Sequence, residues 1–175
     1  ITTQCFYPKI GGIESLMTGM AVAMSKYKNV IVLADGPKNK HDDTSCYKIK
    51  RFNSWKPIRR ISKASYIKNL CKKNKVEGIF SDSWKSIEYL KNLNVPIFTL
   101  AHGTEIQKKF SYLNIHKLNK QNRIRKSYNN SKKIIANSHY TKELLKESLN
   151  IIDKKIVVIH PGIDVYNEFI DSNTT

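Results

Sequence analysis

The amino-acid sequence predicts an α/β fold, an open and mostly parallel sheet with helices on both faces. Short apolar runs alternate with longer amphipathic or basic segments, at intervals of about 20 to 40 residues. Polar clusters that contain Gly, His or Asp follow directly on several of these runs. Alternating strands and helices joined by right-handed crossovers are typical of such a sheet, and ligands bind it beyond the carboxyl ends of the strands.

The beginning of the chain predicts a strand, a helix and a second strand. Residues 1–8 are typical of the end of a strand that runs into a loop, and Gly11 and Gly12 stand directly before a helix. The apolar residues of that helix recur at helical spacing: Ile13, Leu16, Met17, Met20, Ala21 and Met24. Residues 29–34 are nearly all apolar, which favours a strand buried on both faces.

The next segments predict an edge strand and a long basic helix. A polar loop, residues 38–45, leads into residues 46–52, whose alternating pattern predicts a weaker strand near the sheet edge. Pro57 opens a helix that extends to about Lys73. We expect its apolar residues on one side: Ile58, Ile61, Ala64, Ile67, Leu70 and Cys71.

The second half of the chain predicts four more strands and three helices. The strands are residues 78–81, 96–101, 133–136 and 156–160. The helices are residues 83–93, 116–130 and 139–149. In the first of these we expect Trp84 to face inward, and Ser138 is the expected N-cap of the last.

The charge of the chain permits two interpretations. Among 175 residues there are 31 Lys and Arg against 14 Asp and Glu, a formal net charge of +17. Such an excess indicates nucleic acid or an anionic membrane as partner. However, 26 of the bases are Lys, which AT-rich codons encode, so codon usage explains the same composition. A non-catalytic basic α/β module that binds RNA or an anionic membrane surface is therefore the alternative to an enzyme.

Neither a membrane span nor a cysteine framework is visible. No unbroken run of 18 apolar residues occurs. Cys5, Cys46 and Cys71 stand far apart, which supports neither a zinc site nor disulfides. We therefore expect reduced thiols in a cytoplasmic protein.

Five polar clusters follow predicted strands and should meet at one edge of the sheet. They are residues 8–14, 81–84, 102–105, 137–139 and 160–164. Because the carboxyl ends of parallel strands share an edge, we expect a binding crevice there. The combination points to a site more strongly than any one cluster does.

Gly11 and Gly12 are the candidate phosphate site of this crevice. Glycines at a helix N-terminus let the backbone approach an anion, which the free N–H groups and the helix dipole favour. A tight turn between strand and helix explains the same glycines. Asp35 follows the second strand as a ribose-binding acid would, but GxGxxG is absent, which disfavours an NAD-binding domain.

His102 and Glu105 are the candidate side chains for polar ligands. His102 follows the strand 96–101 directly, so its imidazole should project into the crevice and bind a hydroxyl or a phosphate. A structural histidine at the strand end is the alternative. Glu105 has the carboxylate that polyol sites use, but the same charge suits the N-terminus of the next helix.

Four motifs in order resemble the N-terminal domain of retaining GT-B glycosyltransferases of family 4: FYPKIGGIES, PIFTLAHGTE, IIANSHYTKELL and VVIHPGID. The resemblance covers Cys5 to Asp164. It implies an enzyme of two Rossmann-like halves facing across a cleft, in which the N-terminal half mostly holds the acceptor. The implied activity is transfer of a hexose from a nucleotide-sugar to a saccharide or lipid-linked acceptor, in cell-surface polysaccharide or glycolipid synthesis.

The resemblance also implies roles for individual residues. Gly11 and Gly12 would lie near the donor diphosphate. His102 would be the catalytic residue beside the donor sugar, orienting or stabilising it without acting as a nucleophile. The expected contacts to sugar or acceptor are Glu14, Thr104 and Glu105. Asn137 and Ser138 would shape the cleft rim.

The same resemblance divides the chain. Residues 1–164 would form the acceptor-side domain and residues 165–175 the start of a linker, with the donor-binding C-terminal domain absent and the isolated domain inactive. No cofactor or metal is implied, because DxD is missing and Asp42, Asp43 and Asp82 lack a partner at the right spacing. The expected partners are a nucleotide-sugar, the acceptor and the protein's own C-terminal domain. A peripheral contact with the inner face of an anionic membrane is possible on charge grounds, whereas no specific nucleic acid is expected.

Overall fold

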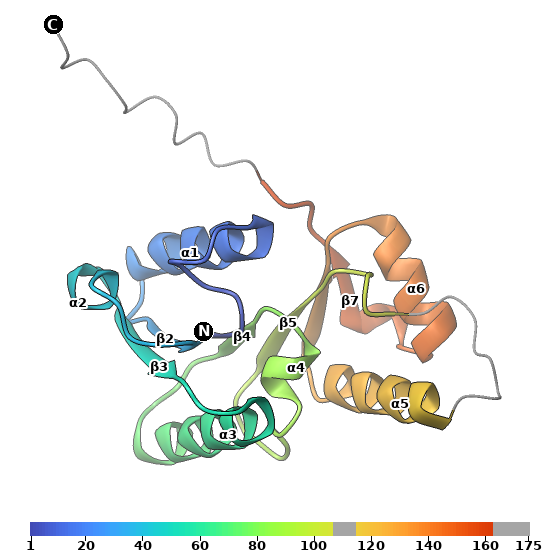
Figure 1. Ribbon diagram of the computed structural model, residues 1–175. Helices are drawn as coiled ribbons and strands as arrows, with labels where there is room; N and C mark the ends of the chain where they lie inside the picture. Colours follow the sequence, from blue (N-terminus) through green and yellow to red (C-terminus); the bar gives the residue numbers. More distant parts are fainter. Residues whose placement is uncertain (107–114, 163–175) are drawn as a thin grey trace, which may run out of the picture.

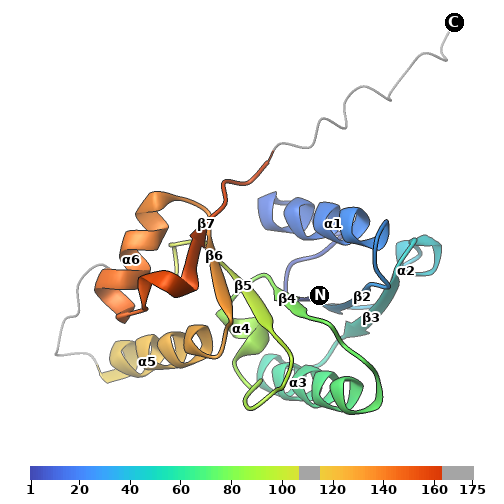
Figure 2. The same ribbon diagram turned by 180° about the vertical axis from the view of Figure 1, so that it is seen from behind.

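The computed structural model describes residues 1–106 and 115–162, and its centre is a sheet of seven strands (Figures 1 and 2). The strands are β1 (Thr2–Thr3), β2 (Ile31–Asp35), β3 (Lys48–Phe52), β4 (Ile79–Ser81), β5 (Ile97–Ala101), β6 (Lys133–Ala136) and β7 (Ile156–Val158). They lie in the order β3-β2-β1-β4-β5-β6-β7, and every neighbouring pair is parallel. The predicted α/β class is confirmed.

Helices cover both faces of the sheet. They are α1 (Gly12–Ser25), α2 (His41–Thr44), α3 (Lys56–Lys73), α4 (Trp84–Ile87), α5 (Ile115–Asn129) and α6 (His139–Leu149), with a short 3-10 helix at Asp153–Lys155. Figure 1 shows α1 on one side of the sheet and α3, α4 and α5 on the other. Right-handed crossovers explain this division, because the chain moves one way along the sheet from β1 to β3 and the other way from β4 to β7.

The core follows the alternation of side chains along the strands. In β2, Val32 and Ala34 pack under α1 against Met17 and Ala21, whereas Leu33 faces α3. The α5 and α6 layer has its own cluster around the fully buried Tyr128. A strand buried on both faces is what the apolar run 29–34 predicts.

Several element boundaries differ from the sequence prediction. The polar segment 38–45 contains the short helix α2. The helix expected over residues 83–93 is only α4, because Leu90 N–H bonds to the Ile87 carbonyl in a tight turn at 2.8 Å and Asn92 takes a left-handed φ of 55°. The last strand, β7, ends at Val158, two residues early. The prediction of an edge strand at residues 46–52 is confirmed by β3.

The prediction of an apolar stripe facing the sheet along α3 is wrong for the first half of the helix. Ala64 and Ile67 are buried against the sheet, but Ile58 and Ile61 are 54% and 53% exposed. Each step of three residues along a helix falls 60° short of a full turn, so a row at this spacing winds around the helix. Lys63 is buried instead.

Part of the domain prediction lies outside the described residues. This applies to Ile163, Asp164 and the linker expected at residues 165–175. Within the described ranges no helix is long and apolar enough to cross a membrane.

Candidate functional site

The carboxyl ends of β1 and β4 are joined by the side chain of Asp82, which is 2% exposed. Its Oδ2 accepts hydrogen bonds from the Gln4 N–H at 2.7 Å and from the Thr3 hydroxyl at 3.0 Å. Its Oδ1 accepts from the Ser86 hydroxyl at 2.5 Å and from the Ser83 hydroxyl at 3.3 Å. One buried carboxylate therefore fixes the end of β1, the end of β4 and the start of α4 relative to one another.

His102 stands at the tip of β5, as predicted, and is partly buried. Its Nε2 lies 2.9 Å from the backbone carbonyl oxygen of Asp82. A carbonyl oxygen only accepts hydrogen bonds, so Nε2 carries a hydrogen and donates. In the neutral ring, Nδ1 is then left as an acceptor for a ligand hydroxyl, and in the protonated ring it is a donor.

Gly103 lets β5 approach the first turn of α6. It has a φ of +76°, and a Cβ there would lie 2.8 Å from the Thr141 Oγ1. That hydroxyl donates to the Asn137 Oδ1 at 2.7 Å, and Ser138 Oγ accepts from the Thr141 N–H at 3.1 Å. The predicted N-cap is confirmed, and the Asn-Ser pair holds α6 where only glycine fits beside it.

Gly11 and Gly12 form the N-terminus of α1. The helix begins at Gly12, and Gly11 is its N-cap in an extended conformation without a side-chain cap. A Cβ on Gly11 would overlap the Glu14 carboxylate, whereas a Cβ on Gly12 would meet nothing within 4 Å. The first-turn N–H groups have no preceding carbonyl of the helix to bond, so this end offers donors to an anion.

Glu14 folds back toward the end of β1. Burial raises the pKa of the Cys5 thiol to about 11, and the negative charges of Asp82 and Glu14 add to the effect. The Glu14 carboxylate therefore lies near Cys5 as well as Gly11. Cys5 stays a neutral thiol there, which makes it a poor nucleophile.

Thr104 and Glu105 occupy different environments. Thr104 is exposed, and its N–H bonds to the His102 carbonyl at 2.9 Å. Glu105 Oε1 accepts from the Tyr128 hydroxyl of α5 at 2.5 Å. Burial raises the pKa of Glu105, although the Tyr128 hydrogen bond and the nearby His102 oppose the shift. The carboxylate thus has a protein partner in α5, while Thr104 is exposed at the rim.

The sequence profile of glycosyltransferase family 4 matches residues 10–166. The chain belongs to glycosyltransferase family 4. The family indicated by the motifs is therefore confirmed. None of the curated protein sequences compared with this family 4 chain is significantly similar to it.

Solved structures share the fold of this family 4 chain. The crystal structure of Anabaena HepE in complex with UDP matches with a TM-score of 0.64 and 13% identity, over 93% of the chain and 44% of HepE. A glycosyltransferase from Rickettsia africae matches at 0.57 and 22%, over 93% and 43%. The lipopolysaccharide outer core galactosyltransferase WaaB matches at 0.60 and 11%, over 95% and 46%. The chain spans less than half of each, and its fold is one Rossmann-like half of GT-B.

A buried charge cluster supports the rim of this family 4 domain from below. Lys63 Nζ donates to the Thr3 carbonyl at 2.7 Å and pairs with the Asp35 carboxylate. Arg59 Nε lies 2.8 Å from Asp35 Oδ2. Asp35 is therefore engaged with α3. The four-residue spacing of Arg59 and Lys63, which places both on one side of a helix, was the available signal for this cluster. This signal was not used in the prediction.

Arg51 fixes the loop between β1 and α1. Its Nη2 donates to the Tyr7 carbonyl and also lies 2.7 Å from the Asp42 Oδ1, and its Nε lies 3.0 Å from Oδ2. The Tyr7 ring packs on His41 of α2 with the ring centroids 4.4 Å apart. The unpredicted helix α2 thus helps to hold the loop that carries Gly11.

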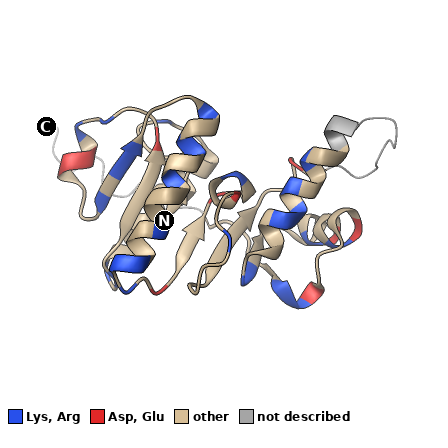
Figure 3. Cartoon of the chain, turned by 90° about the horizontal axis from the view of Figure 1, so that it is seen from below, with Lys and Arg blue, Asp and Glu red and all other residues tan. Residues whose placement is uncertain are grey.

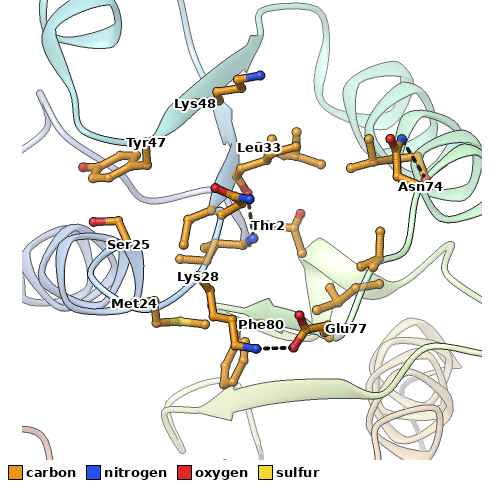
Figure 4. Close-up of a pocket in the computed structure, with 18 of the residues that line it drawn as sticks. Thr2, Met24, Ser25, Lys28, Leu33, Tyr47, Lys48, Asn74, Glu77 and Phe80 are labelled. Carbon is orange, nitrogen blue, oxygen red and sulfur yellow. Dashed lines mark hydrogen bonds and ion pairs between the residues drawn. The ribbon is translucent and has the colours of Figure 1, made fainter.

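A large hollow lies away from this rim. A hollow of about 1250 Å³ lies at the amino ends of the strands, between the ends of α1 and α3 (Figure 4). Thr2 and Phe80 are among its lining residues, and Lys28 and Glu77 pair across it at 2.6 Å. A smaller hollow of about 390 Å³ lies beside the N-terminus of α1, with Glu14 in its wall. Of the candidate site residues only Glu14 lines the smaller hollow, which extends along α1.

No metal site is found in the part of the chain that the structure describes. Among those residues no three His, Cys, Asp or Glu side chains gather where they could hold an ion. Asp82 and Asp42 are committed to protein donors. That the family 4 enzyme needs no metal stays a prediction.

Proposed function

We propose that this chain is the acceptor-side half of a retaining glycosyltransferase. The whole protein would transfer a hexose from a nucleotide-sugar to a saccharide or lipid-linked acceptor, in cytoplasmic steps of cell-surface polysaccharide or glycolipid synthesis. Residues 1–164 would form this half, and a linker would lead from residue 165 to a second half that binds the donor. The chain alone would not catalyse transfer.

The arrangement of His102 and the α1 N-terminus on one rim carries this proposal. The β1 loop, β4 and β5 meet through Asp82, which binds Gln4 N–H with its carboxylate and His102 with its carbonyl. A helix N-terminus without a side-chain cap and an imidazole then face the same edge of the sheet. A glycosyl diphosphate needs an anion site and a polar group near the anomeric carbon, and the rim offers both.

The leaving group explains why the glycine turn matters. As the glycosidic bond breaks, negative charge develops on the diphosphate. Backbone N–H groups of Gly12 and Ile13, with the positive end of the α1 dipole, would stabilise that charge without moving. Positive side chains of the second half would supply the remainder.

His102 would bind the donor sugar or the reacting face of the acceptor. Its Nε2 donates to the Asp82 carbonyl, which holds the ring in one orientation and leaves Nδ1 for a ligand. Nδ1 would accept from a hydroxyl, or donate when protonated. Thr104, which is exposed two residues on, would contact the same ligand, and Glu14 would approach it from α1. Glu105 would act through its second carboxylate oxygen.

Two of the structural neighbours support this donor class. HepE has been crystallised with UDP and with UDP and glucose. WaaB is a galactosyltransferase of the lipopolysaccharide outer core. Both have an N-terminal fold of this kind, so a nucleotide diphosphate sugar is the first donor class to test.

A nucleotide-sugar screen on the full-length protein tests the proposal. We expect release of the nucleoside diphosphate from one or a few donors, and a product whose anomeric configuration by NMR equals that of the donor. Inversion would contradict the retaining mechanism. No binding or turnover of any nucleotide-sugar by the folded full-length protein would contradict the proposal as a whole.

A further inference from the structure

Helix α3 has an outward face that no described element covers. Trp55 directly precedes the helix and is 72% exposed, and Ile58 and Ile61 on its first two turns are 54% and 53% exposed. Spacing of three residues places these side chains within one side of a helix. Large apolar side chains are common singly on surfaces, but three in a row form a patch.

The same side of α3 changes character along its length. It continues from the patch through exposed polar residues to the end of the helix: Ser62, Ser65, Asn69, Lys72 and Lys73. The outer side is therefore apolar at its first end and basic at its last. We call this row, from Trp55 to Lys73, the α3 outer face.

The charged residues of α3 and α5 are all basic. Helix α3 contains seven Lys and Arg and no Asp or Glu, and α5 contains five and again no acid. Seen from below, both helices show blue segments and no red (Figure 3). Between them, Glu88 is neutralised by Arg60 at 3.1 Å and by Arg123 at 2.5 Å. Lys72 and Lys73 pair with no acid among the described residues, so their charge faces solvent.

Helix α1, on the opposite side of the sheet, has no such charge. Helix α1 contains no Lys or Arg, and residues such as Ser15 and Ala23 stand at its exposed positions. Codon usage would enrich lysine on exposed positions of every helix. It therefore does not explain why α3 and α5 carry twelve bases while α1 carries none.

We propose that the α3 outer face docks on an anionic phospholipid bilayer, with α5 beside it. Trp55, Ile58 and Ile61 would enter the boundary between headgroups and acyl chains, and Lys72 and Lys73 would lie over anionic headgroups. A helix that is apolar at one part of its face and lysine-rich at another suits such a surface. RNA suits it less, because isoleucine offers no ring on which a base stacks.

This contact would set how the site meets its substrate. Helix α3 begins at Lys56, just after the carboxyl end of β3, so its apolar end lies at the rim that holds His102. Docking would bring that rim to the membrane, where a lipid-linked acceptor lies. This consequence depends on the proposed function, whereas the lipid contact itself does not.

Trp55 is a built-in reporter for the test. The chain has two tryptophans, and the other, Trp84, is 2% exposed. The chain would be titrated with vesicles of phosphatidylcholine alone and of phosphatidylcholine mixed with phosphatidylglycerol. We expect a blue shift of the emission and quenching by brominated acyl chains with the mixed vesicles only. Unchanged Trp55 emission at saturating mixed vesicles would overturn the proposal.

Variants distinguish docking through the α3 outer face from attraction by net charge alone. Because an exposed lysine near an anionic surface contributes about a fivefold factor in partitioning, the double variant Lys72→Gln, Lys73→Gln should bind about 25-fold more weakly. Ile58→Ser with Ile61→Ser should reduce binding at least about tenfold. Lys26→Gln with Tyr27→Ser, exposed at the end of α1, is the matched control and should bind normally. All substituted positions are exposed, so each variant should melt as the unsubstituted chain does.

Other occupants of the face give distinct results. An equal loss in the α1 control would mean attraction by net charge without a docking face, and would overturn the proposal. So would tighter binding of single-stranded RNA than of mixed vesicles at physiological salt, if it depended on Lys72 and Lys73. Dimerisation of the chain in sedimentation, abolished by Ile58→Ser with Ile61→Ser, would likewise assign the patch to a second copy.

Discussion

The imidazole of His102 and the backbone of Asp82 are joined by a contact of 2.9 Å from Nε2 to the carbonyl oxygen. Asp82 follows β4 and His102 follows β5, so the contact ties two neighbouring strand ends. The Asp82 side chain meanwhile binds the backbone that follows β1. The position of the candidate catalytic ring therefore depends on a residue that need not touch any substrate.

Replacing Asp82 should destabilise the fold. In Asp82→Asn an amide N–H₂ takes the place of one oxygen and cannot accept from its present donors, Gln4 and Thr3 or Ser86. Leaving buried donors unsatisfied costs about 1–3 kcal/mol. Urea unfolding of the chain measures the loss. Ser83→Ala, which removes only the contact of 3.3 Å, is the control and should cost less. Equal stability of Asp82→Asn and the unsubstituted chain would contradict the structural role.

The two glycines at strand ends should respond differently to alanine. Gly103→Ala forces a side chain into a left-handed backbone against Thr141, which should cost about 1–3 kcal/mol of unfolding free energy. Gly12→Ala meets nothing within 4 Å and should leave stability unchanged. Thermal melts of both variants make the comparison, and a Gly12→Ala protein less stable than Gly103→Ala would refute it.

Gly12→Ala is also a probe of the phosphate site. In the full-length protein the new Cβ would keep a diphosphate away from the α1 N-terminus and remove a charge-assisted hydrogen bond. The KM for the donor should rise about 10- to 100-fold, which corresponds to about 1.5–3 kcal/mol. Ser15→Ala, on the exposed side of the same turn, should leave the KM unchanged. If Gly12→Ala has an ordinary KM, the donor phosphates do not bind there.

The pH dependence of stability should depend on Glu105. Burial raises the pKa of this carboxyl above its ordinary value of 4.5. As the pH rises from that value through the folded-state pKa, the unfolded chain ionises more readily, so the fold loses stability. Glu105→Gln does not titrate but can still accept from Tyr128. Its unfolding free energy should therefore exceed that of the unsubstituted chain near neutral pH, and the difference should shrink on acidification.

Glu147→Gln provides the comparison for that measurement. Glu147 is exposed on α6, so its removal should change stability little at any pH. A Glu105→Gln chain that is less stable than the unsubstituted one near neutral pH would mean that the charged carboxylate stabilises the fold.

Chelation should not affect transfer by the full-length protein. The rim carboxylates of Asp82 and Glu105 both accept hydrogen bonds from protein donors in place of an ion. Initial rates with and without EDTA make the test. A rate lost to EDTA and restored by Mg²⁺ or Mn²⁺ would show that a metal takes part.

Much of the architecture follows from local patterns in the sequence. Apolar runs predicted five of the seven strands, and the alternating run at residues 46–52 predicted an edge position that β3 occupies. The glycine turn and His102 could be located because each lies at a predicted strand or helix end. These features depend on neighbours in sequence.

What the sequence did not predict depends on distant partners. Asp82 bonds to Thr3 and Gln4, 79 and 78 residues away, and no local pattern pairs them. Lys63 interrupts the expected apolar stripe of α3 because its ammonium reaches the Thr3 carbonyl across the helix–sheet interface. Isoleucine is typical of a protein core, but Ile58 and Ile61 lie on the outward side of α3. Which side of α3 faces outward is decided by the orientation of the helix against the sheet.

The kinetics of His102→Ala in the full-length protein test most directly whether the rim is the reaction site. His102 is only partly buried and makes its ring contact with one carbonyl, so the variant should unfold at nearly the same temperature. Loss of the oriented imidazole should lower the rate of sugar transfer about 100-fold or more. A folded His102→Ala protein that transfers sugar at the unsubstituted rate would contradict the assignment.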